Sequence, residues 1–222
     1  MYVPPLPDLV FGSGPLRRRQ AIARLLARGL ARLDVRGLEQ VPANGPVVLA
    51  VNHRDFLDGP LLFAFVRRPV AFLTKSEAYT PRATPFLRTT GQIPLVRDRP
   101  DVVAVRAALR VLRAGGVVGV FPEGTRGDGL VQTVKPGVGY FALRSGAAVV
   151  PIACHGTESL KHRGLHRPRV TITLGPPLRL GRVPDGQRVR RPDVLAATEQ
   201  VRATLAALVA GTAPSDSQRV AA

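Results

Sequence analysis

The stretch GPVVLAVNHRDFLDGPLLFAF, residues 45–65, sets a polar loop between two apolar segments. Its first part, 46–51, is a continuous apolar run, which is typical of a strand buried on both faces of a sheet. The loop carries His53, Asp55 and Asp58 in close succession before apolar residues resume. Because functional side chains of α/β proteins gather where strands end, we interpret this junction as the centre of a candidate site.

Outward from this stretch, apolar runs alternate with helical patterns along the chain. The predicted strands cover residues 33–41, 46–51, 69–74, 92–96, 117–121, 147–155 and 169–175. The predicted helices cover residues 15–33, 101–113, 136–145 and 191–211. Because helices separate strands that are mostly uniformly apolar, the sequence predicts an α/β fold: a mostly parallel central sheet with helices on both faces. We expect an N-terminal extension over 1–33, one α/β domain over 34–211 and a loose tail over 212–222.

The predicted helix at 15–33 is amphipathic. At 100° per residue its arginines share one stripe and its large apolar residues take the opposite side: Arg17, Arg24, Arg28 and Arg32 against Ile22, Leu26, Leu30 and Leu33. A basic amphipathic helix of this kind can lie on an anionic membrane surface. It can equally pack on the protein body with its arginine face in solvent, and the two arrangements are compatible.

The chain is strongly basic, with 32 Lys and Arg residues against 15 Asp and Glu residues and a formal net charge of +17. Such a chain is attracted to polyanions such as nucleic acid, anionic lipid headgroups or phosphorylated substrates. Aromatic residues make up only 5% of the chain. That is too few for the stacking platforms of single-strand binders, so we expect no specific nucleic-acid partner.

Other features concern the compartment in which the protein works. Cys154 is the only cysteine, so no intrachain disulfide can form, which fits a reducing compartment, and its apolar surroundings favour an inert thiol. No apolar run approaches the ~20 residues that a membrane span needs, and no signal peptide is evident at the N-terminus. We expect a cytoplasmic protein attached peripherally to the inner face of the cell membrane.

His53 and Asp58 are candidates for acid–base chemistry. A histidine can take a proton from an alcohol near neutral pH, and a carboxylate on its other ring nitrogen steadies the imidazolium that forms. Residues five apart on one helix lie about 140° apart, so these two meet only if a turn intervenes between strand and helix. Asp55 is the competing partner, and a histidine near an aspartate also fits a capping or surface role.

Cationic residues follow several of the predicted strands. Lys75 and Arg97 each follow a strand, and FPEGTRGDG (121–129) adds Arg126 in a turn with Glu123 and Thr125. Arginine grips phosphate as a fork and lysine acts as a point charge. Any one of these cations fits a solvated surface position, but several of them at strand ends favour a phosphate site.

Taken in order, four stretches resemble the 1-acylglycerol-3-phosphate acyltransferase family, whose signature is H-x-x-x-x-D. His53 and Asp58 match that signature. KSEAYTPRATPFLRTTGQIPLVR (75–97) resembles the second block of the family. FPEGTRG (121–127) matches the third block with Gly127 where serine is common, and VVPIACHGT (149–157) resembles the fourth.

The resemblance implies an enzyme that moves a fatty acyl group from an acyl thioester to the free hydroxyl of a lysophospholipid, most directly from lysophosphatidate to phosphatidate. It implies that His53 is the general base, that Asp58 orients it, and that no acyl-enzyme forms. The implied substrate-binding residues are Lys75, Arg97, Glu123, Gly124, Thr125 and Arg126. Lys75 and Arg126 match the positions that hold the acceptor phosphate, and Glu123 shapes its turn and contacts the glycerol part.

The resemblance implies no metal and no cofactor, and it leaves acyl-coenzyme A and acyl carrier protein open as the donor. Another lysophospholipid or a specialised alcohol is an alternative acceptor. A non-enzymatic basic protein that binds membranes or nucleic acid is the alternative outside the family.

Overall fold

In the computed structural model, which describes residues 14–97, 100–162 and 167–213, seven strands form one sheet. They are β1 (Arg32–Arg36), β2 (Val47–Val51), β3 (Val70–Lys75), β4 (Ile93–Leu95), β5 (Val117–Val120), β6 (Ala148–His155) and β7 (Arg169–Leu174). Their order in the sheet is β1-β7-β6-β2-β5-β3-β4, and every neighbouring pair is parallel except β6 and β7. The predicted α/β fold with a mostly parallel sheet is confirmed.

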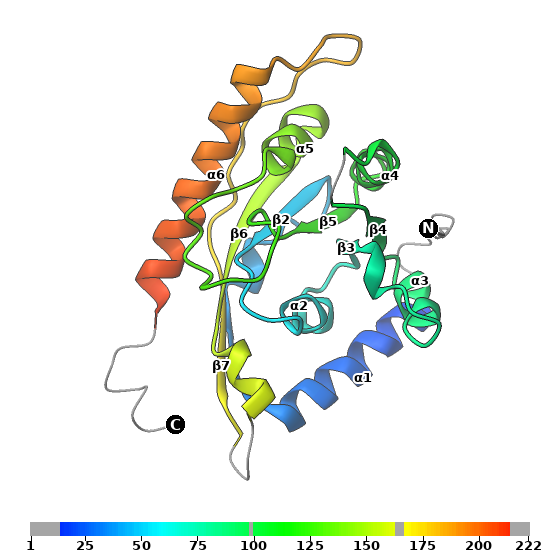
Figure 1. Ribbon diagram of the computed structural model, residues 1–222, viewed down its shortest axis with the longest axis vertical. Helices are drawn as coiled ribbons and strands as arrows, with labels where there is room; N and C mark the ends of the chain where they lie inside the picture. Colours follow the sequence, from blue (N-terminus) through cyan, green and yellow to red (C-terminus); the bar gives the residue numbers. More distant parts are fainter. Residues whose placement is uncertain (1–13, 98–99, 163–166, 214–222) are drawn as a thin grey trace.

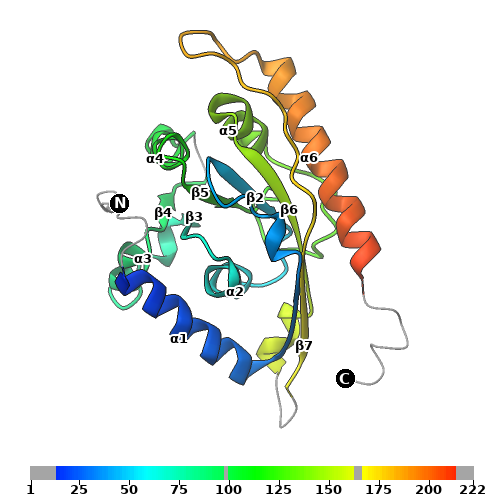
Figure 2. The same cartoon turned by 180° about the vertical axis from the view of Figure 1, so that it is seen from behind.

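Helices cover both faces of this sheet (Figures 1 and 2). One layer holds α1 (Gly14–Leu30) and α2 (Asp58–Phe65), and the other holds α4 (Val102–Arg113), α5 (Gly137–Ser145) and α6 (Arg191–Thr212). The short helix α3 (Thr84–Thr89) lies between β3 and β4 in the chain. The described residues also form three 3-10 turns: η1 (Leu38–Gln40), η2 (Ser76–Ala78) and η3 (Thr157–His162).

The central strand β2 explains why the sheet needs two helical layers. Every residue of β2 is fully buried. Val47, Leu49 and Val51 pack into the core below α1 and α2, while Val48 and Ala50 pack into the core below α4 and α5. Successive side chains of a strand point to opposite faces, so a uniformly apolar strand requires cover on both sides.

The helix α1 packs on α2 through polar side chains, whereas an amphipathic helix on a globular protein usually packs through its apolar face. Gln20 Nε2 donates hydrogen bonds to the carbonyls of Phe63 (3.1 Å) and Val66 (3.3 Å), and Arg24 donates from Nε and Nη2 to the carbonyl of Ala64 (3.1 Å each). These carbonyls lie at the C-terminal end of α2, where the carbonyl groups of a helix have no N–H partner within the helix. Polar donors therefore bind α1 to α2.

The large apolar side chains of α1 consequently point into solvent. Ile22, Leu25 and Leu26 keep 53%, 74% and 62% of their surface exposed. Of the predicted arginine stripe, Arg28 and Arg32 are exposed, as expected for a helix packed on the body with a solvated arginine face, but Arg24 binds α2. In the part of the chain that the structure describes, no helix is both long enough and apolar enough to cross a membrane.

Most predicted elements lie within one or two residues of the observed ones, but the boundary at the start of the domain differs. The helix predicted to reach residue 33 ends at Leu30, and β1 begins at Arg32. The start of the predicted N-terminal extension (1–13) and most of the predicted loose tail (214–222) lie outside the described residues. The proposed division of the chain into three parts stays a prediction.

Candidate active site

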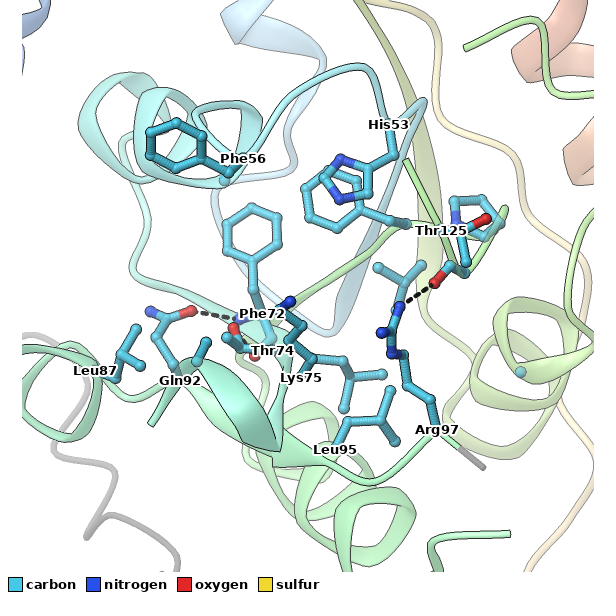
Figure 3. A pocket seen from close by; sticks show the side chains of 18 of the residues that line it. His53, Phe56, Phe72, Thr74, Lys75, Leu87, Gln92, Leu95, Arg97 and Thr125 are labelled. Carbon is cyan, nitrogen blue, oxygen red and sulfur yellow. Dashed lines mark hydrogen bonds between the residues drawn. The ribbon is translucent and has the colours of Figure 1, made fainter. Parts of the chain in front are cut away.

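The carboxyl ends of β2, β3 and β5 meet at one edge of the sheet, beside a cavity of about 1120 Å³. His53 follows β2, Lys75 ends β3 and Phe121 follows β5, and all three line this cavity. Figure 3 shows His53 and Lys75 in this cavity, with Arg97 and Thr125 on one side of it and Leu87 and Gln92 on the other. The parallel strand order thus gathers residues that lie far apart in the sequence.

The imidazole of His53 contacts the carboxylate of Asp58, with Nδ1 lying 3.0 Å from Oδ2. Asp58 is the first residue of α2, so the turn between β2 and α2 brings the two together. The same Oδ2 accepts the backbone N–H groups of Arg54 (2.9 Å) and Asp55 (2.8 Å). Since several donors converge on one fully buried oxygen, the carboxylate acts as an acceptor and Nδ1 carries the proton. Nε2 is then the nitrogen that can exchange a proton with a substrate.

A column of aromatic rings supports the imidazole. The ring of Phe121 stacks on His53 with 4.0 Å between centroids, and Phe72 stacks on Phe121 with 5.6 Å between centroids. The ring of Phe72 lies against Gly119, where an added Cβ would be only 2.3 Å from two of its carbons. Stacking fixes the plane of the imidazole. This column was not predicted from the sequence, although Phe121 opens the FPEGTRG block.

The loop after β5 is bound to the loop after β2. The carboxylate of Glu123 accepts the backbone N–H of His53 at 2.8 Å, and the backbone N–H of Gly127 donates to the carbonyl of His53 at 3.1 Å. Burial raises the pKa of Glu123, and the N–H of His53 opposes that shift. Arg54 adds a hydrogen bond to the carbonyl of Asp128 (2.8 Å). Glu123 therefore binds the backbone of His53 and joins the loop after β5 to the loop after β2.

Asn52, the residue before the histidine, is a second anchor that the sequence analysis missed. Its fully buried amide donates to the carbonyls of Gly129 (3.3 Å) and Cys154 (3.1 Å) and accepts the backbone N–H of Cys154 (2.7 Å). The end of β2 is therefore bound to β6 and to the loop after β5. Burial raises the pKa of the Cys154 thiol well above its ordinary value, so this sulfur stays protonated.

Cations gather on one side of the cavity. The predicted substrate-binding residues Lys75, Arg97 and Arg126 line it, and Lys135 joins them from the loop that precedes α5. Arg97 donates to the carbonyl of Gly124 at 3.1 Å. Gly124 has a φ of +75°, a backbone conformation that residues other than glycine rarely adopt. The methylene groups of the Lys135 side chain lie next to it. Gly124 thus allows a tight turn that contacts both Arg97 and Lys135.

The rest of the cavity is mainly apolar. Its wall is formed by side chains from α2, α3, α4 and α5, from β3 and β4 and from the loop residues next to them: Phe56, Phe63, Leu73, Leu87, Leu95, Val96, Val105 and Phe141. A cationic rim beside a long apolar wall suits a ligand with an anionic head and a hydrocarbon chain. Among the described residues, no group of His, Cys, Asp and Glu side chains is placed to hold a metal ion.

Comparison with known proteins gives a family and several relatives. A model of the acyltransferase family matches residues 32–155. The chain is similar to the chloroplast 1-acyl-sn-glycerol-3-phosphate acyltransferase LPAT1 of Arabidopsis thaliana, with 32% identity over 60% of this chain and 38% of the plant protein. It is also similar to the 1-acyl-sn-glycerol-3-phosphate acyltransferase of Bacillus subtilis (strain 168), with 27% identity over 63% of this chain and 70% of the relative.

A solved structure matches as well. The crystal structure of the 1-acyl-sn-glycerophosphate acyltransferase PlsC from Thermotoga maritima matches with a TM-score of 0.66 and 26% identity, covering 90% of this chain and 81% of that chain. The chain spans less than half the length of the plant relatives that it matches.

Proposed function

Because this chain belongs to the acyltransferase family, we propose that it moves a fatty acyl group from an acyl thioester to the free hydroxyl of a lysophospholipid, most directly lysophosphatidate. The observation that carries the proposal is the His53–Asp58 contact of 3.0 Å beside a cavity with a cationic rim and an apolar wall. The names of the relatives, which are acyltransferases of 1-acyl-glycerol-3-phosphate, support the choice of acceptor.

In the proposed reaction His53 Nε2 takes the proton of the acceptor hydroxyl as its oxygen attacks the thioester carbonyl. The negative charge of Asp58 stabilises the imidazolium that forms. The tetrahedral intermediate then loses the thiolate, which recovers the proton from His53. A C–O bond forms, a C–S bond breaks, and no acyl-enzyme intervenes.

Lys75 and Arg126 hold the acceptor phosphate in this proposal, with Arg97 and Thr125 in the same part of the rim. Fixing the phosphate brings the neighbouring hydroxyl to the histidine, and such positioning contributes to the rate in its own right. Glu123 and Gly124 act by shaping the turn. The acyl chains lie along the apolar wall, and no metal or cofactor takes part.

The acceptor is a membrane lipid, and α1 is the proposed attachment to an anionic membrane surface. Its exposed Ile22, Leu25 and Leu26 supply the apolar contact, and Arg28 on the same helix is exposed for contact with lipid headgroups. Peripheral attachment of this kind would let the enzyme take its acceptor from the bilayer. The basic character of the chain, +17 in net charge, favours an anionic surface.

The test is a mass-spectrometric assay of the purified protein with a panel of lysophospholipids and a mixture of acyl thioesters. We expect acylation of lysophosphatidate, and a His53→Ala variant slower by at least ~10²-fold, the lower range for a general base. An Arg126→Ala variant should raise the KM of the phosphorylated acceptor far more than that of the donor, whereas Arg179→Ala, outside the cavity lining, should change neither. Wild-type rates in the His53 variant, or no acylated lipid at all, would contradict the proposal.

A further inference from the structure

Arg54, the residue after the proposed base, joins the ends of three neighbouring strands. Its Nε and Nη2 donate to the carboxylate of Glu158 in η3 at 3.0 and 2.8 Å, and its Nη1 donates to the carbonyl of Asp128 at 2.8 Å. Glu158 follows β6 and Asp128 follows β5, and both strands pair with β2. One guanidinium therefore binds the loops after β6 and β5 to the loop that carries His53.

The contact between Arg54 and Glu158 is bidentate. Paired N–H···O bonds of this kind are stronger than single ones and also fix the orientation of both groups. The stem of Arg54 lies against Gly129, where an added Cβ would be only 2.6 Å from its Cγ. The Arg54 side chain is 24% exposed and that of Glu158 is 44% exposed. The arginine is therefore held both at its head and along its stem.

Arg54 also contacts the carboxylate that holds the base. Its backbone N–H donates to Asp58 Oδ2 at 2.9 Å, and His53 Nδ1 binds the same oxygen at 3.0 Å. The hydrogen bonds to Glu158 raise the pKa of Arg54 against the effect of burial, and the charge of Asp58 adds to this rise. The positive charge of Arg54 thus acts on Asp58, and the negative charge of Glu158 offsets it.

We propose that Arg54 and Glu158 act together as a positioning pair, which fixes the loop that presents His53 and balances the charge beside Asp58. This inference rests on the proposed role of His53 as general base. Among the described residues, neither member of the pair lines the cavity, so neither is placed to touch a substrate. Since precise placement of a catalytic group contributes to the rate, loss of the pair should lower kcat rather than substrate binding.

The kinetic test compares Arg54→Gln, Glu158→Gln and the double variant. Each single change should lower kcat at least ~10-fold and leave the KM of donor and acceptor within about twofold, because only the placement of the base changes. Since the two residues act as one unit, the double variant should lose no more than the slower single variant. The matched control, Glu199→Gln/Arg202→Gln, removes another bidentate pair, on α6, and should behave as wild type.

NMR titration of the His53 imidazole tests the balance of charge without turnover. In Glu158→Gln the charge of Arg54 is no longer offset, so His53 should titrate at lower pH than in the wild type. In Arg54→Gln the carboxylate of Glu158 is left alone, so His53 should titrate at higher pH. Arg54→Lys keeps the charge but not the fork, so the titration should stay close to that of the wild type while kcat falls.

The other charged and titratable groups around the two loops stay the same in all of these variants. They are Asp55, Asp58, Lys75, Arg97, Glu123, Arg126, Asp128, Lys135 and His155. Shifts in opposite directions can therefore be assigned to the pair. Circular dichroism shows whether each variant is folded, and the charge-preserving Arg54→Lys replaces Arg54→Gln in the kinetic comparison if the latter does not fold.

The outcomes separate this inference from the proposed function. Opposite shifts of the His53 titration support the pair even if no acyl transfer is detected with any substrate. Additive losses in kcat, a KM that rises as much as kcat falls, or titration shifts in the same direction would each overturn the inference. A wild type that transfers acyl groups, together with Gln variants that keep its kcat and its His53 titration, refutes the pair and leaves the proposed function intact.

Discussion

The inverted packing of α1 leads to a prediction about membrane binding. Changing Leu25 and Leu26 to serine removes two side chains that are 74% and 62% exposed and that make no contact that the fold requires. Because the bonds of Gln20 and Arg24 to α2 stay intact, we expect an unchanged fold. The substitution should therefore act on the lipid contact alone.

The size of the effect follows from the exposed surface. Transfer of a whole leucine side chain out of water is worth ~1.5–3 kcal/mol, so the exposed parts of Leu25 and Leu26 are worth together roughly 2–4 kcal/mol. Since ~1.4 kcal/mol corresponds to tenfold in an equilibrium constant, the partition onto vesicles should weaken by roughly 30- to 700-fold. Cosedimentation with vesicles that contain an anionic phospholipid measures this partition.

The matched control is Val102→Ser/Leu195→Ser. These residues are 55% and 49% exposed, but they lie on α4 and α6, in the layer opposite α1. We expect vesicle binding of this control to stay within about twofold of wild type, because the same kind of apolar surface is removed from a face that does not meet lipid. Wild-type sedimentation of the α1 variant, or an equal loss in the control, would refute the reasoning.

Further predictions concern the site. Asp58→Asn should slow acyl transfer by ~10²–10⁴-fold with an unchanged circular dichroism spectrum, because the imidazolium loses its charged partner; a loss below threefold would contradict this role. Gly119→Ala should lower the free energy of unfolding by ~1–3 kcal/mol and slow the reaction, because the new Cβ displaces the ring of Phe72; urea denaturation and kinetics test both effects. Glu123→Gln should remove a pH dependence of the free energy of unfolding. Burial raises the pKa of Glu123 in the folded protein. The free energy of unfolding of the wild type should therefore fall, relative to that of the variant, as the pH rises from the unfolded-state pKa through the folded-state pKa. Denaturation between pH 4 and 7 measures the difference, and parallel pH profiles would argue against it.

Much of the fold could be predicted because buried parallel strands have a plain signature. The valine-rich runs that became β2, β5 and β6 are apolar throughout, and a strand covered on both faces requires this. Such runs do not indicate whether a neighbouring strand is parallel or antiparallel, so the antiparallel pairing of β6 with β7 was not predictable from them. The helix α3 was missed because two prolines in or near a six-residue helix hide its periodicity.

The site was predictable in part. The spacing of His53 and Asp58 allowed a contact only if a turn intervened, and it left Asp55 as a competing partner. The resemblance to the acyltransferase family selected Asp58, and the turn between β2 and α2 brings the two side chains together. The aromatic column was not predictable, because it depends on β3 lying beside β5 with Phe72 opposite Gly119. For α1, periodicity tells which residues share a face, but not whether protein or lipid covers that face.

The bonds between the two catalytic loops have a consequence for how substrates enter. Asn52, His53 and Arg54 are each tied to the loop after β5, so neither loop can open without breaking bonds to the other. Such a cluster opens as one cooperative unit, so we expect the distance between His53 and the turn at 121–127 to stay constant during the proposed reaction. The opposite wall is different, since α3 has no fully buried residue yet contributes Leu87 to the cavity. We therefore expect the cavity wall at α3 to open more readily than the end of the cavity that holds His53.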